Sequence, residues 1–128
     1  MTALVLQGVC WATIGVAKEP DCGDKETQLE MNRCALAVYQ AADQELTRIY
    51  SSLLAKVSDK GKQSLRAIER VWIAYRDKEC AFETSGTEGG TIHAFVAAQC
   101  LTRITRTHVL ELRAQMECEE GDLACGGQ

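Results

Sequence analysis

Apolar residues recur every three or four positions over most of this chain, which is the spacing of an amphipathic helix. The longest such pattern runs from Thr27 to Lys56 and contains neither proline nor glycine. Carboxylates between Asp21 and Asp24 precede it, where they favour the positive end of a helix dipole. We therefore expect one helix about 40 Å long here. Its inward-facing candidates are Met31, Cys34, Ala35, Val38, Ala41, Ala42, Leu46, Ile49, Leu53 and Val57.

A second helical pattern follows the turn cluster Ser58–Gly61, which supplies an N-cap. It predicts a helix over roughly 60–83. The apolar positions that define it are Leu65, Ile68, Trp72, Tyr75 and Phe82.

The glycine-rich segment Ser85–Gly90 separates this helix from a third one. It is a connector, because it lacks the Lys-Ser/Thr end of a phosphate-binding loop. The third helix is expected from about Thr91 to Glu117. Its inward-facing candidates are Ile92, Phe95, Val96, Cys100, Ile104, Leu110, Leu112 and Met116. Short links between long helices imply antiparallel neighbours, so we predict an all-α fold, an antiparallel bundle of about three long helices.

The first seventeen residues form an uncharged apolar stretch that ends before Lys18. The stretch is shorter than the ~20 residues that span a bilayer, but it fits the apolar region of a secretory signal. Gly15 and Ala17 resemble a cleavage site, although no Lys or Arg precedes the stretch. We expect a signal peptide over residues 1–17, with an uncleaved anchor or a buried helix as alternatives. Lipidation of Cys10 is not expected, because Val9 occupies the place of a small residue.

Removal of residues 1–17 leaves six cysteines, and an even number suits disulfides in an exported protein. Six cysteines allow fifteen pairings, and the sequence alone does not choose among them. We favour the sequence-local set, and reduced cysteines in a cytosolic protein are the alternative. A metal site is not expected, because no C-x-x-C occurs and both histidines lie far from paired thiols. The favoured pairs are Cys22–Cys34, Cys80–Cys100 and Cys118–Cys125.

The chain carries a formal net charge of −4 and has a pI near 5.2. We therefore do not expect nucleic acid as a partner, because phosphate binding needs an excess of Lys and Arg on one face. About 110 residues beyond the signal support one domain with a modest core, so the disulfides supplement its stability. We expect the helical domain over residues 18–117 and an acidic, glycine-rich tail over 118–128. Without a local bridge, this tail would be disordered.

The densest group of chemically active side chains runs from Trp72 to Cys80. Trp72 and Tyr75 are expected on one face, and the stem of Arg76 can cover the Trp72 ring. The Arg76 guanidinium would then reach Glu79, or a carboxylate on the first helix such as Asp43 or Glu45.

We favour a structural lock between helices over partner binding for this group. Catalysis has the least support, because Asp77 and Glu79 point to different faces. His93 and His108 are expected at the surface or as caps, and no serine lies in a nucleophile motif. We therefore expect neither enzymatic activity nor a cofactor.

Four segments together resemble the LprI-type domain of bacterial exported proteins. They are Gln28–Ala35, the W-x-x-Y-R-D-x-E-C motif from Trp72 to Cys80, Gly89–Ile92, and Cys100–Arg113. The resemblance covers about Cys22 to Arg113. It implies a helical, disulfide-bearing domain in the periplasm or secreted, and the named function of the family is inhibition of lysozyme. The motif residues are Trp72, Tyr75, Arg76, Asp77 and Glu79.

An acidic inhibitor would be steered electrostatically toward a basic lysozyme, and a protruding polar loop can occupy a catalytic cleft. The candidate partner-binding residues are Gly89, Gly90 and His93 of the glycine-rich loop, or Arg76 if its side chain is exposed. The alternative is a noncatalytic envelope module that binds another partner through one helix face. A thiol oxidoreductase is a third class, and it would need an unpaired reactive cysteine.

Overall fold

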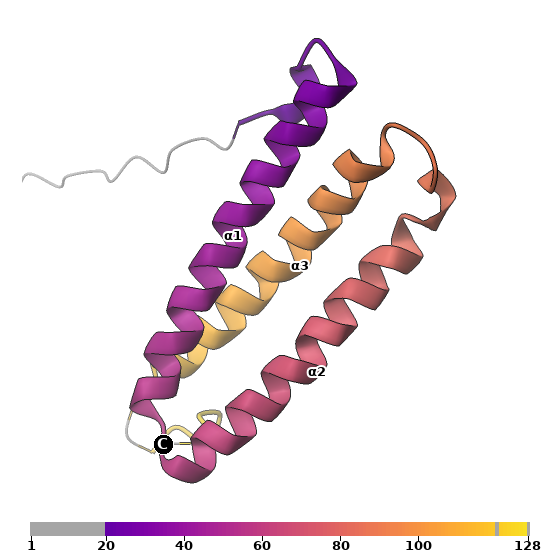
Figure 1. Ribbon diagram of the computed structural model, residues 1–128. Coiled ribbons are helices and arrows are strands. Elements are labelled where there is room, and N and C mark those ends of the chain that lie inside the picture. Colours follow the sequence, from indigo (N-terminus) through magenta and orange to yellow (C-terminus); the bar gives the residue numbers. More distant parts are fainter. Residues whose placement is uncertain (1–19, 120, 128) are drawn as a thin grey trace, which may run out of the picture.

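Three long helices lie side by side in the computed structural model, which describes residues 20–119 and 121–127 (Figure 1). They are α1 (Gln28–Lys56), α2 (Asp59–Glu83) and α3 (His93–Met116), with short 3-10 turns η1 (Cys22–Asp24) and η2 (Ser85–Thr87). Consecutive helices run in opposite directions, and the all-α prediction is confirmed. The predicted signal peptide and Cys10 lie outside the described residues.

Side chains at the helix starts explain where α1 and α2 begin. The Thr27 hydroxyl accepts a hydrogen bond from the Glu30 amide, and the Glu30 carboxylate accepts one from the Thr27 amide. This reciprocal pair is a capping box. Ser58 caps α2 by accepting from the Gly61 amide at 3.2 Å. Asp21, which we expected to mark the start of the first long helix, instead caps η1.

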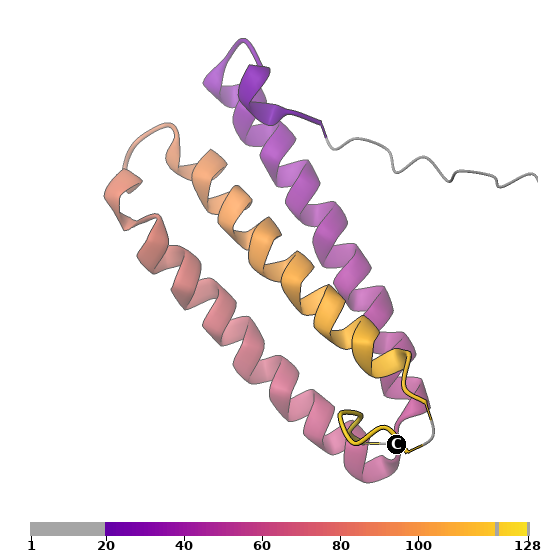
Figure 2. The ribbon, with the colours of Figure 1, turned by 180° about the vertical axis from the view of Figure 1, so that it is seen from behind.

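The core lies mainly between α1 and α3, which run in the same direction (Figures 1 and 2). Most of the inward positions predicted on α1 are buried. On α3 the prediction was wrong for Ile92 and Leu110, whose exposed fractions are 40% and 67%. The buried side of α3 contains small and polar side chains that a hydrophobicity pattern does not detect. They include Ala98, Thr102, Thr105 and His108.

Helix α2 packs less extensively against the other two helices. Of its five predicted apolar positions, Leu65 is buried and Trp72 is half-buried. The other three, Ile68, Tyr75 and Phe82, are exposed, so Trp72 and Tyr75 do not share a buried face. The inward side of α2 instead contains glycine, charged residues and a cysteine, which an apolar pattern cannot predict. The residues on this side are Gly61, Leu65, Glu69, Trp72, Arg76 and Cys80.

All three sequence-local disulfides are present, so the favoured pairing is confirmed. Their Cα–Cα distances are 5.5 Å, 5.6 Å and 5.8 Å in chain order, within the usual range. Cys22–Cys34 fastens η1 to α1, and Cys80–Cys100 joins α2 to α3. Cys118–Cys125 closes a small loop in the tail.

The tail folds back onto the turn between α1 and α2, at the end of the bundle opposite η2 (Figure 2). The Gly127 carbonyl accepts hydrogen bonds from the Ser58 amide and hydroxyl at 2.8 Å and 3.2 Å. Gln115 bonds to the backbone of both Ala124 and Gly126. A Cβ atom on Gly61 would lie 2.4 Å from the Gly127 carbonyl oxygen, so this contact requires glycine. The local bridge thus accompanies a docked tail.

Replacement of Cys80 and Cys100 by serine should lower the free energy of unfolding by about 3 kcal/mol, because the bond closes a loop with a sequence separation of 20. Urea denaturation followed by circular dichroism measures the change. The matched variant lacking Cys118–Cys125, with a separation of 7, should lose less. Reducing agent should lower the melting temperature of the wild type, and an unchanged transition would contradict a stabilising role.

Candidate functional site

The motif from Trp72 to Cys80 presents two different sides of α2. Trp72, Arg76 and Cys80 face α1 and α3, whereas Tyr75 and Asp77 face outward. The inner side carries the contacts that attach α2 to the rest of the bundle. The outer side is available to a partner.

Arg76 is the centre of the inner side, and only 11% of its side chain is exposed. Its guanidinium pairs with Asp43 of α1 at 3.3 Å and with Asp77 at 2.8 Å. The guanidinium carbon also lies 5.3 Å from the ring centre of Trp72 and 5.7 Å from that of Tyr39. Asp43 is one of the carboxylates that we expected to receive it. We named Arg76 as a partner-binding candidate only if its side chain was exposed. It is buried in these contacts, so it does not serve as a contact residue for a partner.

His108 forms a second link between α2 and α3, and the expectation that it lies at the surface was wrong. The residue is 4% exposed, and its ring stacks on Trp72 with 4.2 Å between centroids. One ring nitrogen lies 3.0 Å from Glu69 of α2, and the other lies 3.0 Å from Glu111 of α3. Burial alone would lower the pKa of His108, but the two carboxylates outweigh it and raise this pKa.

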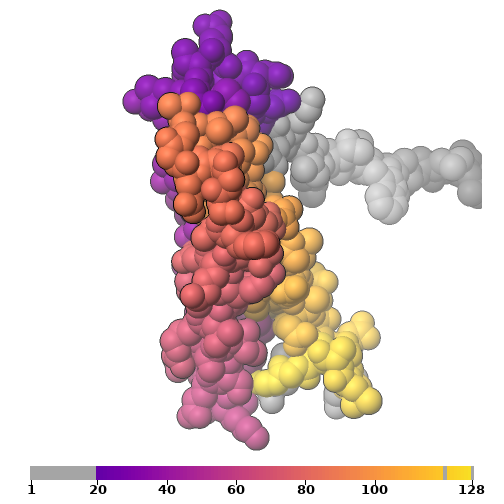
Figure 3. Space-filling model, turned by 90° about the vertical axis from the view of Figure 1, so that its right-hand side faces the viewer, coloured from indigo at the N-terminus to yellow at the C-terminus, as the bar shows by residue number. Residues whose placement is uncertain are grey.

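The outer side of α2 carries four exposed apolar side chains at helical spacing. Ile68, Val71, Tyr75 and Phe82 are 56%, 71%, 53% and 77% exposed. Steps of three, four and seven residues place them along one side of the helix. We call this set of four residues the outer α2 stripe. Figure 3 shows the molecule with α2 toward the viewer. Rows of exposed apolar residues of this kind mark interaction surfaces. Val71 was missed by the sequence analysis.

The glycine-rich loop lies at the same end of the bundle as η1 (Figure 1). The Thr87 hydroxyl donates to the Thr84 carbonyl at 2.8 Å and lies 2.9 Å from the ring of His93. Gly89 has a positive φ of 77°, which glycine adopts without strain. Gly89 and Gly90 are exposed, and His93 is half-buried. These three predicted residues lie together at the loop, away from Arg76.

Asn32 of α1 fastens this loop from the other side. Its side-chain amide donates to the Thr91 carbonyl at 3.0 Å. The loop is therefore held by contacts at both ends and has a defined shape.

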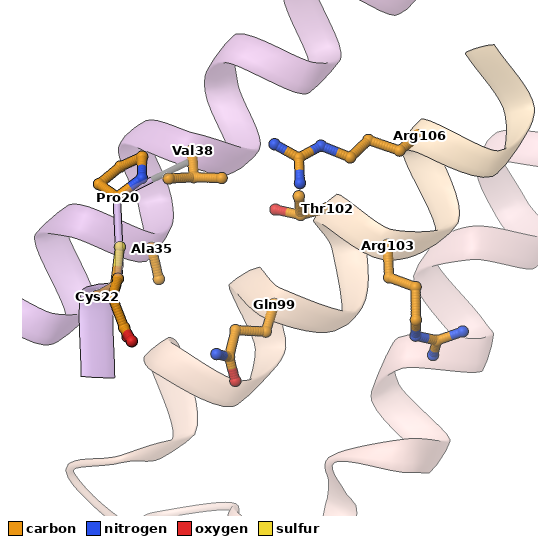
Figure 4. Close-up of a pocket in the computed structure, with 9 residues that line it drawn as sticks. Pro20, Cys22, Ala35, Val38, Gln99, Thr102, Arg103 and Arg106 are labelled. Carbon is orange, nitrogen blue, oxygen red and sulfur yellow. The ribbon is translucent and has the colours of Figure 1, made fainter. Parts of the chain in front are cut away.

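Hollows open between the helices of the described part of the chain. One of about 440 Å³ lies between η1, α1 and α3, where Val38, Thr102 and Arg106 surround it (Figure 4). Arg103, at its border, pairs with Glu83 of α2 at 2.6 Å. Another hollow, of about 690 Å³, lies near the tail and includes His108 in its wall. Within residues 20–119 and 121–127, no group of three or more His, Cys, Asp and Glu side chains is placed to hold a metal ion.

Comparison with known proteins identifies the class to which this fold belongs. The family model described as Lysozyme inhibitor LprI matches residues 20–112, and the chain belongs to this family. A protein from Rhizobium meliloti (strain 1021), described only as uncharacterized, is 31% identical over 115 residues, covering 80% of this chain and 83% of that protein. No solved structure matches. The helices of the described part of the chain are not long and apolar enough for any of them to cross a membrane.

The match includes η1, the three helices up to Leu112 and the motif on α2. The tail and its Cys118–Cys125 bond lie beyond it. The Arg76 and His108 contacts and the loop at the η1 end thus lie within the matched range, whereas the docked tail lies outside it.

Arg76→Ala should lower the free energy of unfolding by about 2 kcal/mol, because it leaves Asp43 and Asp77 without their cation and opens space beside Trp72. Arg70→Ala is the matched control, since Arg70 is an exposed residue on the same helix. Urea denaturation compares the two variants. If the two variants had the same free energy of unfolding, the buried arginine would not be what holds α2 to its neighbours.

His108 should make stability depend on pH. Its folded-state pKa is raised, so the stability contributed by its charged form is fully present below the unfolded value of about 6.5. This contribution is lost as the pH rises through the folded-state pKa. The melting temperature of the wild type should therefore exceed that of His108→Gln most near pH 6 and by less at pH 9. A difference that grows toward pH 9 would contradict this assignment.

Proposed function

We propose that this protein is an exported, noncatalytic inhibitor of lysozyme that acts through the end of the bundle formed by η1 and the glycine-rich loop. Membership of the LprI family supports this function. Export is supported by the three disulfides, which persist in oxidising compartments, and by the apolar first seventeen residues.

We choose this surface because the loop end of the bundle is acidic and carries one large exposed apolar side chain. Phe82 is 77% exposed at the last turn of α2, directly before the loop. Glu88 projects from the loop, and several more carboxylates surround η1 at the same end. These carboxylates belong to Asp21, Asp24, Glu26 and Glu30, with Lys25 and Arg33 as the cations among them. A basic lysozyme would be attracted to such a surface.

The loop has the build of an inhibitory probe. Gly89 and Gly90 have no side chains, so their backbone can approach a narrow cleft closely. The bonds of Thr87 to Thr84 and His93 give the loop its shape before binding, which reduces the entropy lost on association. His93 in this arrangement supports the loop from within, and Phe82 serves as the apolar anchor. Inhibition follows from occupation of the cleft and requires no covalent step.

A second candidate function is a noncatalytic module that binds another envelope protein through the outer α2 stripe. The exposure of Ile68, Val71 and Tyr75 favours it, because these side chains lie toward the middle of α2 and away from the loop end. An amphipathic helix of a partner could cover such a row. The two candidates share Phe82 but differ elsewhere, since the first relies on Glu88 and the glycine-rich loop and the second on Ile68, Val71 and Tyr75.

The purified protein should slow the lysis of bacterial cells by a chicken-type lysozyme, followed as loss of turbidity. A Phe82→Ala, Glu88→Lys variant should need about tenfold more protein for the same inhibition, because it loses the anchor and reverses a steering charge. Val71→Ala is the matched control on the stripe and should leave inhibition unchanged.

Two outcomes of this assay would contradict the proposal. Lysis at the uninhibited rate in the presence of excess wild-type protein would refute lysozyme inhibition. Inhibition that is weakened by Val71→Ala and not by the loop variant would move the contact surface to the outer α2 stripe.

A further inference from the structure

The hollow of about 690 Å³ near the tail has the dimensions and lining of a small-molecule site. It lies between the last turns of α1, the first half of α2 and the last turns of α3. Ligand sites usually enclose ~300–1,000 Å³ and have mostly apolar walls with a few polar groups. The apolar wall consists of Leu53, Val57, Leu65, Ile68 and Leu112.

The carboxylate in this wall belongs to Glu111. It lies beside His108, which also lines the cavity and whose other ring nitrogen is held by Glu69 from outside the lining. Because Glu69 also pairs with His108, the imidazole does not depend on Glu111 alone. The Glu111 side chain is 63% exposed, so its carboxylate remains open to a further partner. Glu69, at 13%, does not.

The tail closes one end of the cavity. Gly126 and Gly127 line it, and Gly127 is bonded to Ser58 at the start of α2. Gln115 also lines the cavity, but its amide is already bonded to the tail backbone. Lys60 is the cation among the lining residues, and it lies on the exposed first turn of α2. The remaining polar lining is neutral, from Ser58 and Ser64.

We propose that this cavity binds a small amphipathic cation, with an apolar chain among Leu53, Leu65 and Leu112 and an ammonium group at Glu111. The apolar walls select the chain by burial, and each buried methylene contributes about 0.8 kcal/mol. The carboxylate selects the charge, since it accepts a charge-assisted hydrogen bond from an ammonium group and repels an anion. This site is distinct from the loop end, and it does not depend on lysozyme inhibition.

Titration calorimetry with the full chain and three probes of equal chain length tests the proposal. The probes are octylamine, octanol and octanoate, below their aggregation concentrations. Octylamine should bind one molecule per chain, and octanoate should bind at least tenfold more weakly. Glu111→Gln should weaken octylamine about tenfold and leave octanol unchanged, because it removes the charge and keeps the shape.

Two further variants locate the binding. Ile68→Trp should weaken octylamine and octanol alike, because the larger side chain fills the cavity while the exposed position tolerates it. Leu110→Gln is the matched control, since Leu110 is exposed on α3 and does not line the cavity. Octylamine binding that is insensitive to both Ile68→Trp and Glu111→Gln overturns the proposal, as does absence of binding at millimolar concentration. Tighter binding of octanoate, through Lys60, overturns the assignment of charge.

Discussion

The attachment of α2 to the α1–α3 pair is the interaction on which the other features of this protein depend. It relies on one disulfide, Cys80–Cys100, on Leu65 in the apolar core, and on long charged side chains that reach the neighbouring helices. Arg76 extends to Asp43 of α1, and Glu69 extends to His108 of α3. Buried charges cost solvation free energy unless they are paired, and here Arg76 and His108 are each paired with a carboxylate and lie against the Trp72 ring. The attachment therefore fixes the orientation of α2 through a few specific contacts and not through close packing along the whole helix.

That mode of attachment explains why α2 has a polar inner side and an apolar outer side. The inner positions that would normally hold leucine or valine hold Glu69, Arg76 and Cys80. Apolar residues at Val71 and Tyr75 then face solvent, where they are available to a partner, and Ile68 is exposed at the wall of the cavity near the tail. The cavity near the tail lies beside the same contacts, since His108 lines it. Both candidate binding surfaces outside the loop therefore lie next to the contacts that attach α2.

Much of the fold could be predicted from the sequence, because helices are encoded by local signals. Proline-free periodic stretches, the turn at Ser58–Gly61 and the glycine-rich loop located all three helices to within about two residues, as expected for helix ends. The sequence left fifteen disulfide pairings open, and the sequence-local set that we favoured is the one in the structure, because turns bring these segments together. The loop residues Gly89, Gly90 and His93 were also identified as one group, because they are nearly adjacent in the chain.

The sequence by itself determined the helices, their order and the presence of a family motif from Trp72 to Cys80. Only the tertiary structure decided which side of α2 faces inward and that His108 is buried. The physical reason is that helical periodicity records which residues share a side, but not which side meets a neighbour. Charged residues such as Arg76 and His108 become buried only when partners from distant parts of the chain, Asp43 and Glu69, compensate them. That compensation exists only in the folded bundle.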